Sequence, residues 1–127
     1  MPHFGRRSRR HLATCDERLQ RILNDVIERV DCAVICGTRG KAAQDKAYRE
    51  GASTVQWPNS RHNASPSTAV DVVPWPLSWD VSDPAVRDTW DVLALEIKGT
   101  ANRLGIPIEW GGDWRRFKDL PHWQLPR

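Results

Sequence analysis

Two stretches of the sequence have the apolar spacing of long amphipathic helices, and they constrain the fold more than any other feature. The first stretch has apolar residues at Leu19, Ile22, Leu23, Val26, Ile27 and Val30. The second has them at Val86, Trp90, Leu93, Ile97, Ala101 and Leu104. A helix with one apolar stripe must bury that stripe against another element. The fold therefore needs a shared core that covers both helices.

Capping residues predict where these helices begin and end. Thr14-Cys15-Asp16-Glu17 has the pattern of a capping box, which predicts that the first helix begins at Thr14. Asp83-Pro84 predicts the start of the second helix, and Gly105 predicts its end. Helix-forming residues predict a further short helix over 41–50.

Short apolar runs between the helices predict strands. The clearest are 32–36 and 69–73, and further candidates are 106–110 and 122–125. The polar, proline-containing stretch 53–67 has no regular period and predicts an ordered loop. We predict an α+β fold with a small, mostly antiparallel sheet, helices packed on one side and a cleft on the other.

The composition is that of a globular protein. The 127 residues are enough for one domain spanning 1–127, with 39% hydrophobic and 28% charged residues. No apolar run approaches the roughly 18 residues of a membrane span, so no transmembrane segment is expected. The arginine-rich start has no apolar stretch behind it, so we expect synthesis in the cytoplasm without a secretion signal. We expect a monomer.

The net charge of +3 comes largely from the first part of the chain. Four arginines lie within 6–10, in a segment 1–13 that we interpret as a solvated basic arm. Such an arm suits nucleic acid or an anionic wall polymer equally well. The cysteine count is three, which is odd, and a strand over 32–36 would hold its two end cysteines about 13 Å apart. We therefore expect reduced thiols.

Two histidines and two aspartates form a candidate catalytic site. His62, Asp71 and His122 match the number and type of ligands in catalytic zinc sites, which keep one position open. Asp119 is the candidate acid/base for hydrolysis, and Glu109 is its rival. The spacing of His62 and Asp71 matches no helical metal motif, and an isolated His122 is more often structural. The residues alone leave both interpretations open.

Five segments together resemble a known family. They are Cys36-Gly37-Thr38-Arg39, Ser60-Arg61-His62, Ala69-Val70-Asp71, Trp110-Gly111-Gly112-Asp113-Trp114 and Asp119-Leu120-Pro121-His122-Trp123-Gln124. This set resembles the phage endolysin branch of the zinc D-Ala-D-Ala carboxypeptidase superfamily, which contains L-alanyl-D-glutamate endopeptidases. The resemblance covers nearly the whole chain and implies a Hedgehog/DD-peptidase-like fold.

The resemblance also implies roles for individual residues. It implies that His62, Asp71 and His122 bind Zn²⁺ and that Asp119 is the catalytic acid/base. It assigns Arg39, which by itself is typical of a surface arginine, to polarising the scissile carbonyl.

Three further residues are expected to contact substrate. They are Ser60, beside a proposed ligand, and the aromatic residues Trp110 and Trp123. Aromatic rings can stack on sugars or peptide planes, although core packing of these rings stays open as an alternative.

The expected function is zinc-dependent hydrolysis of a peptide bond in bacterial peptidoglycan, most simply between L-Ala and D-Glu. The expected partner is the peptidoglycan of the cell wall, and no nucleic-acid partner is expected. The alternatives are a D-Ala-D-Ala carboxypeptidase or dipeptidase and an inactive cell-wall-binding module. A basic nucleic-acid binder would leave the polar residues of the candidate site unexplained.

Overall fold

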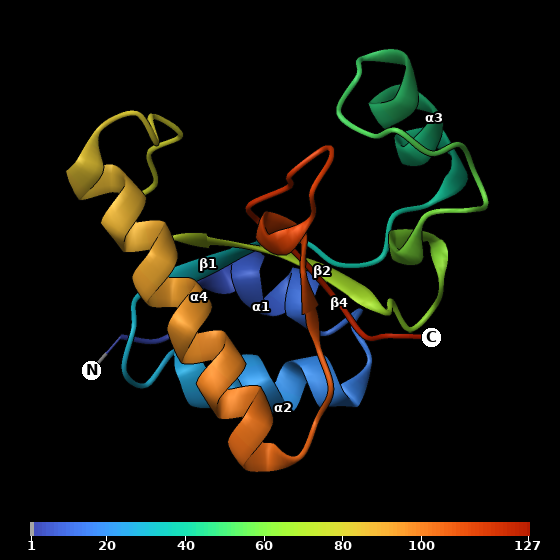
Figure 1. Ribbon diagram of the computed structural model, residues 1–127. Helices are drawn as coiled ribbons and strands as arrows, with labels where there is room; N and C mark the ends of the chain where they lie inside the picture. The colour runs from blue at the N-terminus through green and yellow to red at the C-terminus, as the bar shows by residue number, and fades with distance from the viewer. Residues whose placement is uncertain (1) are drawn as a thin grey trace.

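The computed structural model describes residues 2–127 and shows a four-stranded sheet surrounded by helices (Figure 1). The helices are α1 (Arg6–Leu12), α2 (Glu17–Val26), α3 (Lys41–Arg49) and α4 (Pro84–Leu104), with 3-10 turns η1 (Arg61–Asn63) and η2 (Gly111–Asp113). The strands are β1 (Cys32–Cys36), β2 (Ala69–Pro74), β3 (Glu109–Trp110) and β4 (His122–Gln124). The strand order is β1-β2-β4-β3, and all neighbours are antiparallel, so the predicted α+β fold is confirmed. Over residues 2–127, no helix has both the length and the apolar character to cross a membrane.

The two amphipathic helices bury their stripes in one core beneath the sheet. Leu19 and Ile22 of α2, and Ile97 of α4, are completely buried. Val70 and Val72 belong to the same cluster and reach it from β2. Full burial of a side chain of this size stabilises the fold by about 1.5–3 kcal/mol. In Figure 1, α1 and α2 lie on one side of the sheet, and α3 lies on the other.

The start of α2 differs from the prediction. Its N-cap is Asp16, whose side chain accepts a hydrogen bond from the backbone N–H of Arg18. Thr14 instead donates its hydroxyl to the carbonyl of His11 and accepts from the backbone N–H of Thr38 at 2.8 Å. The predicted capping box was wrong because Thr14 follows the end of α1, a helix that the sequence analysis did not foresee.

The predicted solvated arm over 1–13 was also wrong, because most of it folds as α1 against β1. Phe4 and Leu12 are buried in the core. The hydroxyl of Ser8 accepts a hydrogen bond at 3.0 Å from the backbone N–H of Val34. The arginines of α1 remain exposed on the opposite side of the helix, and the first residue lies outside the described part of the chain.

A β-bulge in β1 changes which side chains face the cleft. Val34 pairs with Val72, whereas the next registered pair is Cys36 with Asp71, so Ile35 is the extra residue. In a regular strand, Cys36 would share the core-facing side of Val34. The bulge instead brings Cys36 beside Asp71 and directs the following turn toward the cleft.

All three cysteines are free, in agreement with the prediction of reduced thiols. Cys15 and Cys32 are 2% and 4% exposed. Burial away from water disfavours the thiolate and raises the pKa of each of these two thiols to about 12. Cys36 is only partly buried.

We predict that Gly37→Ala destabilises the fold by about 1–3 kcal/mol, the usual cost of overpacking. A Cβ at Gly37 would collide with the Thr14 hydroxyl and the His11 carbonyl. The matched control is Gly99→Ala, because a Cβ at this position within α4 meets nothing within 4 Å. The control should stabilise the helix by about 0.5–1 kcal/mol. Urea unfolding of both variants measures the difference, and equal stability of the Gly37 variant and the parent protein would contradict the prediction.

We also predict that a thiol-alkylating reagent at pH 8 modifies Cys36 well before Cys15 or Cys32 in the folded protein. The reactive species is the thiolate, which burial suppresses at the latter two positions. Peptide mass spectrometry after timed alkylation identifies the modified residues. Denatured protein, in which all three should react at similar rates, is the control, and early modification of Cys15 in the folded protein would refute the assignment.

Candidate metal centre and active-site cleft

A cleft of about 760 Å³ lies over the face of the sheet opposite the core. One wall is formed by the segments 51–55 and 59–62, and another by 117–122. Asp71 lies between these walls, and Arg39 borders the cleft from the turn after β1. The cleft thus brings together segments that are far apart in the sequence.

The central row of the sheet places three polar side chains next to one another. Cys36 of β1 pairs with Asp71 of β2, and Asp71 in turn pairs with His122 of β4. Residues opposite each other in antiparallel strands share a face, so all three side chains lie on the same side of the sheet, and Asp71 and His122 line the cleft there. His62 reaches the same point from η1, and its ring centroid lies 5.1 Å from that of His122.

His62 is held in one orientation by the backbone around it. Its Nδ1 lies 2.8 Å from the carbonyl oxygen of Gly37, which can only accept, so Nδ1 donates this hydrogen bond. Nε2 therefore faces Asp71 Oδ1 at 3.2 Å. Ser60 caps η1 by accepting from the backbone N–H of His62 at 3.2 Å, and it also borders the cleft. The short capped turn thus fixes the imidazole.

His122 is oriented by side chains instead. Its Nε2 lies 2.8 Å from Gln124 Oε1, and Gln124 Nε2 donates to Glu109 Oε2 at 2.9 Å. The other nitrogen, His122 Nδ1, lies 3.3 Å from His62 Nε2 and 3.5 Å from Asp71 Oδ1. Glu109, the rival base of the sequence analysis, does not line the cleft.

Asp71 carries a buried oxygen at the meeting point of these rings. Its Oδ1 forms no aligned hydrogen bond with any of the described residues, although both imidazoles approach it. Burial opposes ionisation, but contacts with His122 and His62 outweigh it and hold the pKa of this carboxyl below its usual value. Burial likewise disfavours charged His62, but the Asp71 contact raises the pKa of His62 to about 10. A buried carboxylate that two imidazole nitrogens face forms a binding position for a cation.

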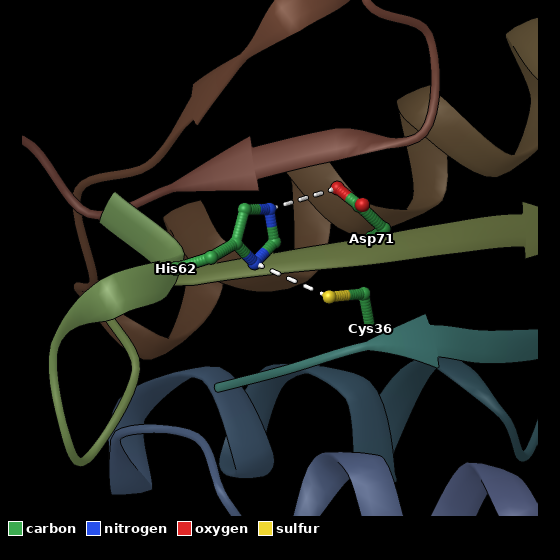
Figure 2. A group of neighbouring side chains, drawn as sticks. All are labelled: Cys36, His62 and Asp71. Carbon is green, nitrogen blue, oxygen red and sulfur yellow. Dashed lines mark hydrogen bonds and ion pairs between the residues drawn. The ribbon is translucent and has the colours of Figure 1, made fainter. Parts of the chain in front are cut away.

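Cys36 is a candidate ligand that the sequence analysis missed. One potential ligand atom from each of Cys36, His62 and Asp71 lies within 4.8 Å of the others, so these three residues could hold a metal ion. Figure 2 shows the thiol and the carboxylate on opposite edges of the imidazole ring. The thiol faces Nδ1 at 3.8 Å, whereas the carboxylate faces Nε2. In the sequence, Cys36 is only the start of a segment that resembles the family, and it is the bulge in β1 that places the thiol here.

Arg39 is anchored at the wall of the cleft. Its guanidinium lies 3.8 Å from Asp71 Oδ2 and donates to Gln44 Oε1 at 3.0 Å. Gln44 is completely buried and also accepts from Asn63 Nδ2 at 3.1 Å. The backbone N–H of Arg39 donates to the carbonyl of His62 at 2.7 Å. Gln44, which the sequence analysis also missed, therefore ties α3 to the two sides of the site.

Asp119 lies at the edge of the site, partly exposed to the cleft. Its Oδ2 is 4.0 Å from His122 Nδ1. The backbone N–H of His122 donates to the carbonyl of Asp119 at 3.1 Å, so a tight turn brings the carboxylate back over the histidine. Burial and then the negative charge of Asp71 raise the pKa of Asp119. A Cβ at Gly111 would collide with the Asp119 backbone, so this close approach requires glycine.

The structure contradicts the expectation that Trp110 and Trp123 contact substrate. The two residues pair across β3 and β4, and their rings stack at 5.5 Å in the core. Trp123 is only 2% exposed and Trp110 8%, and neither lines the cleft. Successive side chains of a strand alternate between faces, so His122 and Gln124 face the cleft while Trp123 faces the core.

Other aromatic side chains border the cleft in their place. Trp114 lies 5.2 Å from the His122 ring, and Trp79 is 55% exposed. Phe117 is 77% exposed and has a positive φ of 54°, a strained backbone for a residue other than glycine. Neither Phe117 nor Lys118, which also lines the cleft, carries a sequence signal for such a position.

Three comparisons with known proteins agree with one another. Residues 1–123 match the family model of the phage L-alanyl-D-glutamate peptidase. The chain is 30% identical over 111 residues to the peptidoglycan L-alanyl-D-glutamate endopeptidase CwlK of Bacillus subtilis (strain 168), covering 76% of this chain and 61% of that protein. It is also similar to the crystal structure of the L-Ala D-Glu endopeptidase ChiX of Serratia marcescens, with a TM-score of 0.80 and 31% identity.

That structural match covers 98% of this chain and 91% of the ChiX chain, whereas the present chain spans 61% of CwlK. The agreement therefore extends over the sheet, the helices and the segments that border the cleft. On these grounds, the chain belongs to the family of phage L-alanyl-D-glutamate peptidases.

Proposed function

We propose that the protein is a zinc-dependent endopeptidase that cleaves the bond between L-alanine and D-glutamate in bacterial peptidoglycan. The observation that carries this proposal is the convergence of His62 Nε2, His122 Nδ1 and the orphan Asp71 Oδ1 on one buried point. The family supplies the substrate class, because its model and both relatives are named for this bond.

The donor set and its spacing support zinc as the ion. Tetrahedral zinc with bonds of about 2.0–2.1 Å to nitrogen and oxygen sets its ligand atoms about 3.3–3.4 Å apart. The three separations between the ligand atoms of His62, Asp71 and His122 are 3.2, 3.3 and 3.5 Å. The hydrogen bonds at the far nitrogens direct the remaining nitrogen of each imidazole at the same point, where a bound cation would take the place of any proton. We therefore assign these three residues as the ligands. Cys36 is not included, because its thiol faces Nδ1 of His62, the nitrogen that binds the Gly37 carbonyl, and not Nε2.

Three groups of the chain share the chemical work in this proposal. When bound, zinc would act as a Lewis acid on the scissile carbonyl and lower the pKa of the attacking water. Asp119, with its raised pKa, accepts the proton of this water and delivers it to the departing amine. Arg39 is held rigidly and stabilises the negative charge that develops on the carbonyl oxygen. Ser60 borders the cleft and contacts substrate there.

We predict that zinc-loaded protein releases fragments with new amino-terminal D-glutamate from purified peptidoglycan. A chelator should abolish release, and added zinc should restore it. Mass spectrometry of the soluble fragments provides the measurement. Release of free D-alanine would instead indicate a carboxypeptidase, and a zinc-loaded protein that binds wall material without cleaving it would indicate a binding module.

We predict that Asp119→Ala lowers kcat by about 10²–10⁴-fold, the usual contribution of general acid–base catalysis, while zinc content stays at the parent level. The matched control is Asp113→Ala on the same loop, whose carboxylate is 57% exposed and paired with Lys98 at 2.7 Å. This control should retain parent activity. If zinc is lost together with activity in the Asp119 variant, Asp119 is a ligand and the proposed role is wrong.

A further inference from the structure

Three side chains form a hydrogen-bonded series that runs outward from the metal centre along the edge of the sheet. Glu109 of β3 and Gln124 of β4 are directly paired in the register, and His122 lies two residues before Gln124 on the same face. Glu109 Oε2 accepts from Gln124 Nε2 at 2.9 Å, and Gln124 Oε1 lies 2.8 Å from His122 Nε2. We name this chain of Glu109, Gln124 and His122 the edge relay.

The donors and acceptors of the edge relay fit together in one direction only. An ionised carboxylate can only accept, so Glu109 turns the NH₂ group of Gln124 toward itself. The amide oxygen of Gln124 then faces His122, and an oxygen requires a donor, so Nε2 carries the proton. A neutral imidazole has a single N–H, which leaves the lone pair on Nδ1 directed at Asp71 and His62. We infer that Glu109, acting through Gln124, sets the tautomer of His122.

The two histidines of the site therefore differ in how they are oriented. The carbonyl oxygen of Gly37 accepts a hydrogen bond from His62 Nδ1. This backbone carbonyl cannot rotate to present a donor in place of its oxygen. Gln124 can present either its oxygen or its NH₂ group after a half-turn of the amide. The exposed Glu109 decides between these two, so a residue outside the cleft acts as a positioning residue for the site.

The consequence for metal binding rests on the proposed function, whereas the tautomer does not. With the amide reversed, the NH₂ group of Gln124 would face Nε2, and the imidazole proton would move to Nδ1. That proton would occupy the place where a cation must bind. Loss of a partner that orients a ligating histidine typically costs about 10–100-fold in metal affinity.

The test uses full-length variants that reverse, remove or restore the edge relay. Glu109→Lys places a donor beside Gln124 and reverses the amide, and Gln124→Leu removes the acceptor without adding charge. The double variant Glu109→Gln with Gln124→Glu exchanges the two groups and keeps the direction of the relay. The matched control is Glu28→Lys, which makes the same charge change at an exposed position in the turn that follows α2.

Two measurements are made on each variant. Nitrogen-15 NMR of the metal-free protein at pH 8 reports which nitrogen of His122 carries the proton, and competition with a chromophoric chelator reports zinc affinity. We expect the Nδ1–H tautomer and about 10–100-fold weaker zinc binding in Glu109→Lys. Gln124→Leu should also weaken zinc binding. The exchanged double variant and Glu28→Lys should keep the Nε2–H tautomer and bind zinc within about threefold of the parent protein.

The inference is overturned if His122 keeps the Nε2–H tautomer in Glu109→Lys. It is also overturned if the exchanged pair is no better than Gln124→Leu in zinc affinity. If the parent protein binds no zinc, the proposed function fails, but the NMR measurement still decides the role of Glu109.

Discussion

The carboxylate of Asp71 lies in the centre of the sheet, and the surrounding residues compensate for its burial. Burying an ionised group costs several kcal/mol unless other charges or hydrogen bonds compensate. Here one oxygen faces the nitrogens of His62 and His122, and the other lies 3.8 Å from the guanidinium of Arg39. The low pKa of this carboxyl follows from the two histidines. The site therefore consists of groups that compensate the charge of a buried anion, and the proposed cation would add to this compensation.

The sheet keeps this polar cluster apart from a densely packed core only a few ångströms away. Along β4, His122 and Gln124 face the cleft, whereas Trp123 between them is 2% exposed and stacks on Trp110. Along β2, Asp71 lies between the buried Val70 and Val72. Alternation of side chains along β2 and β4 is thus the physical basis for a charged site and an apolar core on opposite faces of one small sheet.

A second layer of uncharged polar groups holds the charged ones in place. Gln44 is completely buried and binds Arg39, Asn63 and the loop that follows α3 through both ends of its amide. Gln124 plays the same role at the opposite end of the site, where its amide lies between His122 and Glu109. An amide donates through its NH₂ group and accepts through its oxygen. The neighbour at one end therefore determines which of these two groups faces the neighbour at the other end. The precision of such a site depends on these groups as much as on the residues that touch the substrate.

The sequence by itself determined the two long helices, the short strands and the type of chemistry, because these depend on local spacing and residue type. The end of α4 at Gly105 and its cap at Asp83 are also local signals and are confirmed. Only the tertiary structure decided that Trp110 and Trp123 belong to the core and that α1 packs on the sheet, because both outcomes depend on strand register and available partners. The β-bulge at Ile35 decided that Cys36 faces the site. Register and bulges arise from contacts between segments distant in the chain, and no local pattern records them.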